Sequence, residues 1–274
     1  MPNKLYIVIL ACLYCFCIAC SKDKSVTPGK MPPAGTDPKI ALYGDSVFYI
    51  QSADLLVKPV VTKAGTYSSL PEGLKIDEVT GEIDVNKSET GLKYQVTFTP
   101  ADASGSQVNY VVISGINYED KIYNLSAGDS VATPIYNANA RLTMPDAGLD
   151  NVFDESGGCK NAGIAVDPKN ARINLAQTVR NQAIDTGATQ EVKLAYRIND
   201  KSEKALNGLN VKIYFYRNAS EIPQYLIDLI NERKTTILYS GAIIRSFALN
   251  TSGLKVNVKK PARPRPPCII VVGN

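Results

Sequence analysis

The chain has 274 residues, of which 45% are hydrophobic, enough for hydrophobic cores and typical of about two domains. Its 30 basic and 26 acidic residues leave a net charge of +4, too small an excess to indicate a nucleic-acid partner. The chain contains no histidine, which excludes a Ser-His-Asp triad, a Cys-His pair and an imidazole metal site.

The N-terminal segment has the layout of a secretion signal. A short segment with Lys4 precedes the apolar run LYIVILACLYCFCIA, which ends at Ala19. This run falls short of the ~20 residues that a membrane-spanning helix needs. We therefore expect residues 1–19 to be a signal peptide, with an uncleaved anchor helix as the alternative.

The end of this run, Cys17-Ile18-Ala19-Cys20, resembles the lipobox of bacterial lipoproteins. The resemblance implies that Cys20 carries lipid and anchors the chain in a membrane. Ser21 follows instead of Asp, so by the sorting rule of that family we expect an outer-membrane lipoprotein of the cell envelope. The next residues, SKDK, resemble surface-export signals, which implies exposure at the cell surface. Residues 20–38 are rich in Pro, Gly, Ser, Thr and Lys and predict a flexible tether.

One pattern occurs twice. Residues 73–85 read GLKIDEVTGEIDV, and ninety residues later residues 163–175 read GIAVDPKNARINL. Alternating apolar residues on both sides of a turn predict a hairpin with one buried face. In the first copy we expect Asp77 to hold the turn and Gly81 to adopt positive φ. The residues that should share a core are Leu74, Ile76, Ile83 and Val85.

The second copy carries Ala171 in place of the glycine. Since asparagine tolerates the left-handed region, we expect Asn170 to adopt it there. Alternation then resumes at Ile173 and Leu175, which predicts a second strand.

Each hairpin is followed by two further strand patterns, at residues 94–99 and 108–113 and again at 192–198 and 209–216. Short strands separated by turns predict β-sandwiches. The segment at residues 222–233 has helical periodicity, with Ile222, Tyr225, Leu226, Leu229 and Ile230 on one face. It predicts a crossover helix that packs on the second sandwich.

Residues 70–99, LPEGLKIDEVTGEIDVNKSETGLKYQVTFT, resemble the immunoglobulin-like module of bacterial surface proteins. The resemblance covers about residues 40 to 116, and the whole chain resembles a lipoprotein of Bacteroidota. It implies an immunoglobulin-like β-sandwich at residues 39–118. The second half matches this module only through the hairpin and the strand order, so we expect residues 119–274 to form a second, diverged β-sandwich with one crossover helix. The expected fold is therefore mainly β, with two tandem immunoglobulin-like β-sandwich domains. The resemblance implies nothing about activity.

Two cysteines remain after the signal and the lipidated residue, Cys159 and Cys268. The cell envelope permits disulfides, so we expect them to pair; two separate buried thiols are the alternative.

Four acidic residues lie close together in the segment MPDAGLDNVFDESGG. Oxygen ligands suit Ca²⁺, but the spacing is not that of an EF-hand loop, so solvated loop carboxylates are the favoured interpretation. The candidate metal residues are Asp146, Asp150, Asp154 and Glu155. No other cofactor is indicated.

Tyr214 and Tyr216 lie in the strand pattern IYFY and are the candidate ligand-binding residues, because an outward tyrosine ring can stack on a sugar. The alternative is that this stretch contributes only to the core. Lys259–Pro267 should be an extended, proline-rich segment, followed by a short apolar strand at Cys268–Val272. That strand is expected to close a sheet edge, or else to be donated to a neighbouring subunit.

Together these features predict a non-catalytic, lipid-anchored cell-envelope protein. Its favoured function is binding or adhesion, with a surface glycan or another envelope protein as the partner. The alternative is a structural or assembly subunit of fimbrial type that uses its C-terminal strand. An enzyme that acts on glycosides is the third hypothesis, for which no nucleophile motif or placed carboxylate pair is present.

Overall fold

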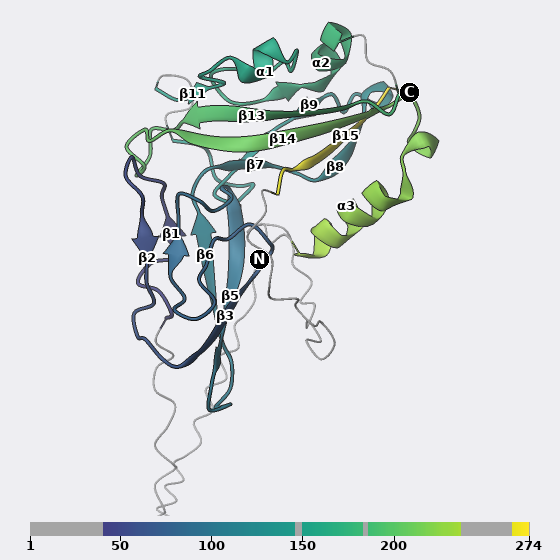
Figure 1. Cartoon of the computed structure of the whole chain (residues 1–274). Helices are drawn as coiled ribbons and strands as arrows, with labels where there is room; N and C mark the ends of the chain where they lie inside the picture. The colour runs from purple at the N-terminus through teal and green to yellow at the C-terminus, as the bar shows by residue number, and fades with distance from the viewer. Residues whose placement is uncertain (1–40, 146–149, 183–185, 237–264, 274) are drawn as a thin grey trace, which may run out of the picture. The chain divides into compact units, whose positions relative to one another are not determined.

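The computed structural model describes residues 41–145, 150–182, 186–236 and 265–273 (Figure 1). Strands dominate these residues, which confirms the prediction of a mainly β chain. Residues Ala41–Asn274 form one compact unit. None of the described helices is long and apolar enough to cross a membrane. The predictions for residues 1–38, including lipidation of Cys20, lie outside the described residues.

The first half contains a four-stranded sheet. Its strands are β1 (Val47–Phe48), β3 (Gly65–Leu70), β5 (Leu92–Pro100) and β6 (Gln107–Ile113), in the order β1-β6-β5-β3. The short β1 is parallel to β6, whereas β5 is antiparallel to both neighbours. Alternate residues of β5 from Leu92 to Phe98 are buried, as expected when successive side chains point to opposite faces.

The first predicted hairpin is present. Ile76 bridges to Ile83 in β4 (Ile83–Asp84), which also pairs with β2 (Leu56–Val57). Asp77 Oδ1 accepts the backbone N–H groups of Val79 and Thr80 at 3.0 and 2.7 Å, and Gly81 has φ +70°. The predicted roles of both residues are therefore confirmed. So is the shared core: Leu74, Ile83 and Val85 are buried in one cluster, with Ile76 packed against it.

The second hairpin repeats the backbone hydrogen bonds of the first, shifted by ninety residues. The bonds Asp77 N–H to Glu82, Gly81 N–H to Asp77 and Asp84 N–H to Lys75 recur as Asp167 to Arg172, Ala171 to Asp167 and Asn174 to Ala165. Ala171, not Asn170, takes the left-handed conformation, with φ 58°, so that prediction is wrong. The Asn170 side chain instead binds Asp167 and the N–H of Arg172, as the Thr80 hydroxyl binds Asp77 and Glu82.

The strand predicted through Leu175 is also wrong beyond Asn174. The short β12 (Ile173–Asn174) pairs with β9 (Val131–Ala132), and α2 (Leu175–Gln182) begins at once. The Asn174 side chain accepts the N–H of Gln177 at 2.9 Å. This is an N-cap interaction, which satisfies a free backbone donor at the start of the helix.

A five-stranded sheet dominates the second half. It contains β8 (Lys121–Asn124), β11 (Val152–Phe153), β13 (Thr189–Arg197), β14 (Asn207–Tyr216) and β15 (Cys268–Val272), in the order β11-β13-β14-β15-β8. The C-terminal strand was expected at an edge, but β15 lies between β14 and β8 and is parallel to both. All five of its residues are buried, as is usual for parallel strands covered on both faces.

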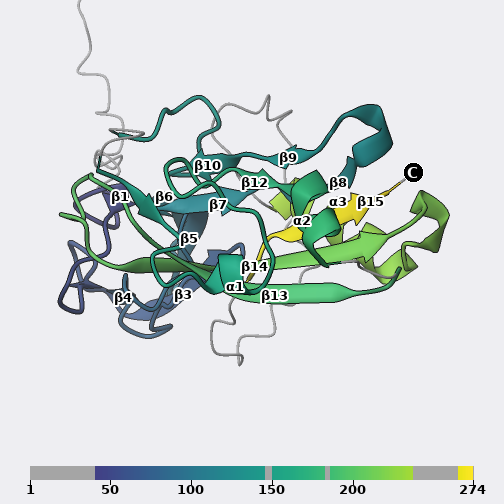
Figure 2. The same cartoon turned by 90° about the horizontal axis from the view of Figure 1, so that it is seen from above.

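Three α-helices are described in the second half, where one was predicted. They are α1 (Gly158–Asn161), α2 and α3 (Gln224–Thr236). The two views agree that α1 and α2 cover one face of the sheet and α3 the other (Figures 1 and 2). In α3, Leu226 and Ile230 are buried as predicted, whereas Tyr225 is 63% exposed.

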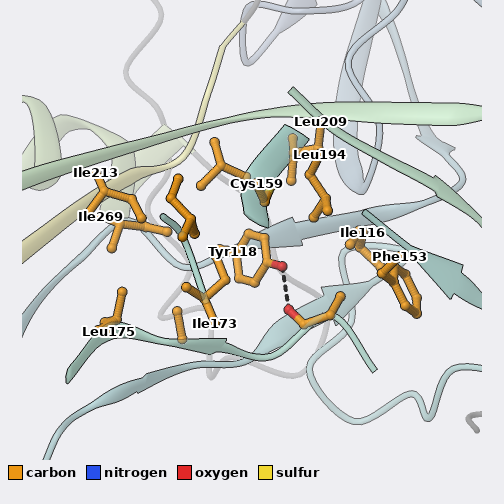
Figure 3. Packing of buried hydrophobic residues seen from close by; sticks show 14 of the residues in the cluster. Ile116, Tyr118, Phe153, Cys159, Ile173, Leu175, Leu194, Leu209, Ile213 and Ile269 are labelled. Atoms are coloured by element: carbon orange, nitrogen blue, oxygen red, sulfur yellow. Dashed lines mark hydrogen bonds between the residues drawn. The ribbon is translucent and has the colours of Figure 1, made fainter. Parts of the chain in front are cut away.

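The inner face of this sheet packs on β9, β12, α1, α2 and the pair formed by β7 (Ile116–Tyr118) and β10 (Pro134–Tyr136). Tyr118 lies among the buried residues of this core and donates from its hydroxyl to the Ala171 carbonyl at 2.5 Å (Figure 3). In the first half Tyr43 donates in the same way to the Gly81 carbonyl at 2.8 Å. The two hairpins thus share a tyrosine contact as well as their backbone bonds.

The two halves contact each other directly. The Tyr196 hydroxyl lies 2.9 Å from Thr90 Oγ1 and accepts the Ile116 N–H at 3.2 Å. Ala205 of the second half is buried in the core of the first. Tyr118, directly before the predicted boundary, is the last residue of the buried strand β7, and Glu119, directly after it, is exposed. The division at residues 118 and 119 stays a prediction.

Candidate functional site

The candidate site is the outer face of β13 and β14, the face turned away from the core of Figure 3. It is called here the β13–β14 face, and it consists of four cross-strand pairs: Thr189 with Tyr214, Glu191 with Lys212, Lys193 with Asn210, and Ala195 with Gly208. The residues between them, such as Leu194 and Val211, point into the core, because strand side chains alternate. From Gly208 to Tyr214 the face is about 20 Å long, at ~3.3 Å per residue.

A cleft of about 300 Å³ lies at one end of this face, where the two halves meet. Asn86, Ser88 and Thr90 line it from the first half, and Lys193 and Asn207 line it from the second. The cleft therefore combines amides, hydroxyls and an ammonium group, which together can donate and accept hydrogen bonds. Concave sites between domains with a few polar groups are common ligand sites.

Neighbouring residues orient Asn86 and leave room for Lys193 in the cleft. The Asn86 amide donates to the Gln51 carbonyl at 2.8 Å, which fixes its orientation, and among the described residues its Oδ1 has no hydrogen-bond partner. The Lys193 side chain lies across Gly208: a Cβ at residue 208 would come within 2.4 Å of Lys193 Cε. The glycine thus leaves room for the lysine to cross to β14.

Tyrosines gather at the other end of the face. The Lys212 ammonium lies 5.5 Å from the centre of the Tyr214 ring and 3.2 Å from Glu191 Oε2. Burial raises the pKa of Tyr214 and Tyr216, and the nearby Tyr225 of α3 adds to both rises. Tyr214 is half-buried, Tyr216 is covered, and Tyr225 is exposed.

The two tyrosines predicted from the sequence, Tyr214 and Tyr216, therefore lie on one face of β14, with Ile213 and Phe215 in the core. Sequence reasoning missed Tyr225, which was assigned to the buried side of its helix, and it missed the cleft entirely. The cleft joins segments about a hundred residues apart, and nothing in local periodicity signals such a contact.

The three candidate calcium ligands that the structure describes do not converge. Asp154 accepts the N–H groups of Cys159 and Lys160 at 2.8 and 2.9 Å. Glu155 pairs with Arg197 at 2.9 Å, and Asp150 lies 3.7 Å from the Lys204 ammonium. In the part of the chain that the structure describes, no three acidic or sulfur side chains gather at a metal-binding distance; Asp146 lies outside it.

The predicted disulfide is wrong. Cys159 and Cys268 are both free and buried, and they belong to different clusters: Cys159 of α1 packs beneath the inner face, and Cys268 of β15 packs under α3 on the outer face. The sheet separates them. Burial raises the pKa of Cys159 to about 12 and that of Cys268 to about 11, so both behave as small apolar side chains.

No family model matches the chain, and a search of curated proteins found no match. Among solved structures, a crystal structure of Drosophila N-cadherin EC1-4 is similar at 13% identity over 61% of this chain and 47% of that one, with a TM-score of 0.18. The chain thus spans about half of that structure's length. A TM-score this low carries no argument about function.

Proposed function

We propose that this protein is a non-catalytic, lipid-anchored cell-envelope protein that binds carbohydrate along the β13–β14 face. The observation that carries the proposal is the row of polar side chains on this face, which leads from a polar cleft to Tyr214 and the exposed Tyr225. A sugar ring presents an apolar C–H face and an edge of hydroxyls. Tyrosine rings stack on the C–H face, and their hydroxyl groups bind the sugar hydroxyls. Charged and amide groups fix the orientation of the ligand.

The length of the face favours a chain of several sugar rings over a single one. The cleft at Lys193 and the rings at Tyr214 and Tyr225 stand at opposite ends of an extended row about 20 Å long. Binding at both ends allows one oligosaccharide to gain affinity from two weak contacts in the same molecule.

Two further parts of the proposal concern architecture and location. The repeated hairpin bonds and the tyrosine contact to each turn support two tandem immunoglobulin-like modules. The lipobox resemblance at Cys20 supports a lipid anchor in the outer membrane. Several acyl chains would hold the protein there strongly, because each methylene buried in the membrane contributes ~0.8 kcal/mol. Fractionation and mass spectrometry test the anchor, and an unacylated chain outside the envelope would refute it.

A glycan array probed with the Ala41–Asn274 unit tests the binding proposal, since this unit contains all the described cores. We expect a bound oligosaccharide whose affinity falls about tenfold, or ~1.4 kcal/mol, in Tyr225→Ala and in Lys193→Ala. The matched control is Tyr110→Ala in the first half: Tyr110 is 46% exposed and also has a lysine over its ring, Lys93 at 5.0 Å.

The control variant should bind like the parent chain. An array without any bound glycan, or an equal loss in all three variants, would refute carbohydrate binding by this face. Release of sugar during the incubation would instead support the glycosidase hypothesis.

A further inference from the structure

The C-terminal strand β15 pairs with a strand on each side, and side chains from distant parts of the chain bind both of its ends. It lies between β14 and β8, and the residues that contact its ends belong to the rest of the fold. At its start, Asp120 Oδ1 accepts the Cys268 N–H at 2.6 Å, while Arg233 donates to the Pro266 carbonyl at 2.8 Å. Arg233 and Asp120 are themselves paired at 2.5 Å and almost fully buried.

The far end of the strand is held equally firmly. The Gly273 N–H donates to the Tyr216 carbonyl, and Ser126 Oγ donates to the Gly273 carbonyl, both at 3.0 Å. Between the two ends the strand fills two cores: Ile269 and Val271 lie in the inner cluster, and Cys268, Ile270 and Val272 lie under α3. The space between β14 and β8 is called here the slot. It determines the position and direction of the strand that fills it, and it has an apolar environment for each of the five side chains.

The first half closes without such an insertion. Its N-terminal strand β1 pairs directly and in parallel with its last strand β6. In the second half the corresponding strands are β8 and β14, which are also parallel in direction but are separated by β15. The inserted strand is thus an addition to the repeated arrangement, and its removal would leave two unpaired edges, which recruit strands from other chains.

We propose that the slot between β14 and β8 accepts the Cys268–Val272 strand of a second copy of this chain, so that copies are linked by strand exchange. Every residue that holds the strand lies at or before Arg233 and belongs to the accepting copy. Residues 237–267 join the strand to α3, and this connection spans up to roughly 100 Å when extended. A neighbouring copy is therefore within reach. Exchange of an identical element between copies makes no new type of contact.

A cross-link between two different chains tests the proposal. The accepting chain is the Ala41–Asn274 unit with Cys159→Ala, Cys268→Ser and Lys212→Cys. The donating chain carries only Cys159→Ala and keeps Cys268. Because Lys212 is the register partner of Cys268, the two cysteines meet only when the donor's strand lies in the acceptor's slot. The chains are mixed at rising concentration after brief exposure to urea and are then oxidised.

We expect a covalent heterodimer whose yield rises with concentration and exceeds at least tenfold that of a control acceptor with Lys193→Cys in place of Lys212→Cys. Lys193 lies on the same face but pairs with Asn210 of β14, so it does not adjoin β15. Equal yields from the two acceptors, or no heterodimer, would overturn the proposal. If the Lys212→Cys acceptor does not fold, Asn124→Cys on β8 with a Val272→Cys donor tests the other side of the slot with the same outcomes.

Discussion

Replacement of Gly81 by alanine tests whether the first hairpin turn requires glycine, although the second turn has alanine at the equivalent position. Gly81 has φ +70°, and a Cβ there would lie 2.6 Å from Tyr67 Cε1 and 2.8 Å from Pro59 Cγ. Tyr67 is buried, and the centre of its ring lies 4.7 Å from the centre of the Phe98 ring. The Tyr67 side chain therefore has little room to move. The left-handed conformation costs a non-glycine residue about 1–2 kcal/mol, and overpacking adds about 1–3 kcal/mol.

The reduced freedom of the unfolded chain offsets about 0.4–1 kcal/mol of this cost. We therefore expect Gly81→Ala to lower the stability by about 2–4 kcal/mol. For a unit of this size, that corresponds to a melting temperature roughly 5–15 °C lower. The assay is a thermal melt of the Ala41–Asn274 unit followed by circular dichroism.

The matched variant is Ala171→Gly at the equivalent position of the second hairpin. Ala171 already has φ 58° and is fully buried. Glycine removes about 1 kcal/mol of backbone strain there, which stabilises the protein. Two effects oppose this gain: one buried methyl group is lost, at ~0.8 kcal/mol, and the unfolded chain gains conformational entropy. The net change should stay within about 1 kcal/mol. A Gly81→Ala melt within 2 °C of the parent, or a larger loss from Ala171→Gly than from Gly81→Ala, would refute the reasoning.

Three further predictions concern buried and titratable groups. Asp120→Ala should cost about 3–5 kcal/mol in urea unfolding, because it leaves a buried guanidinium without its carboxylate and the Cys268 N–H without its acceptor; an unchanged midpoint would contradict this. At pH 8 a thiol reagent should label neither Cys159 nor Cys268 until the chain unfolds, since burial raises the pKa of both; rapid labelling of the native protein would disprove it. Hydrogen bonds from Thr80 lower the pKa of Asp77, so its stabilising contribution is present above pH ~4 and is lost as the pH falls through the lower native value. The free energy of unfolding of Asp77→Asn should therefore decrease less steeply below about pH 4 than that of the parent chain. The same pH dependence in both chains would argue against this role of Asp77.

Short-range features of the fold could be predicted from the sequence. The turn at Asp77 depends on atoms within five residues, and the alternation from Leu74 to Val85 determines which side chains are buried. Both are properties of adjacent residues, and both were confirmed. The start of α2 was missed, although Asn174 three residues before Gln177 is a recognisable N-cap signal.

The candidate site could be predicted only in part. The sequence pointed to Tyr214 and Tyr216, but Lys193, Asn86 and Tyr225 come together through contacts between strands, halves and a helix. Alternation says which face a side chain occupies and not which strand lies beside it.

The sequence alone thus determined the repeated turns, the predominance of strands and the inward-facing residues, because these follow from local hydrogen bonds and from a period of two. Only the tertiary structure decided that β15 lies between β14 and β8 and that Cys159 and Cys268 are on opposite faces of one sheet. Each of these depends on packing between segments far apart in the chain. An apolar strand such as Cys268–Val272 can pair with any open edge, and the edge it takes is the one whose flanking groups, Asp120 and Ser126, satisfy its ends.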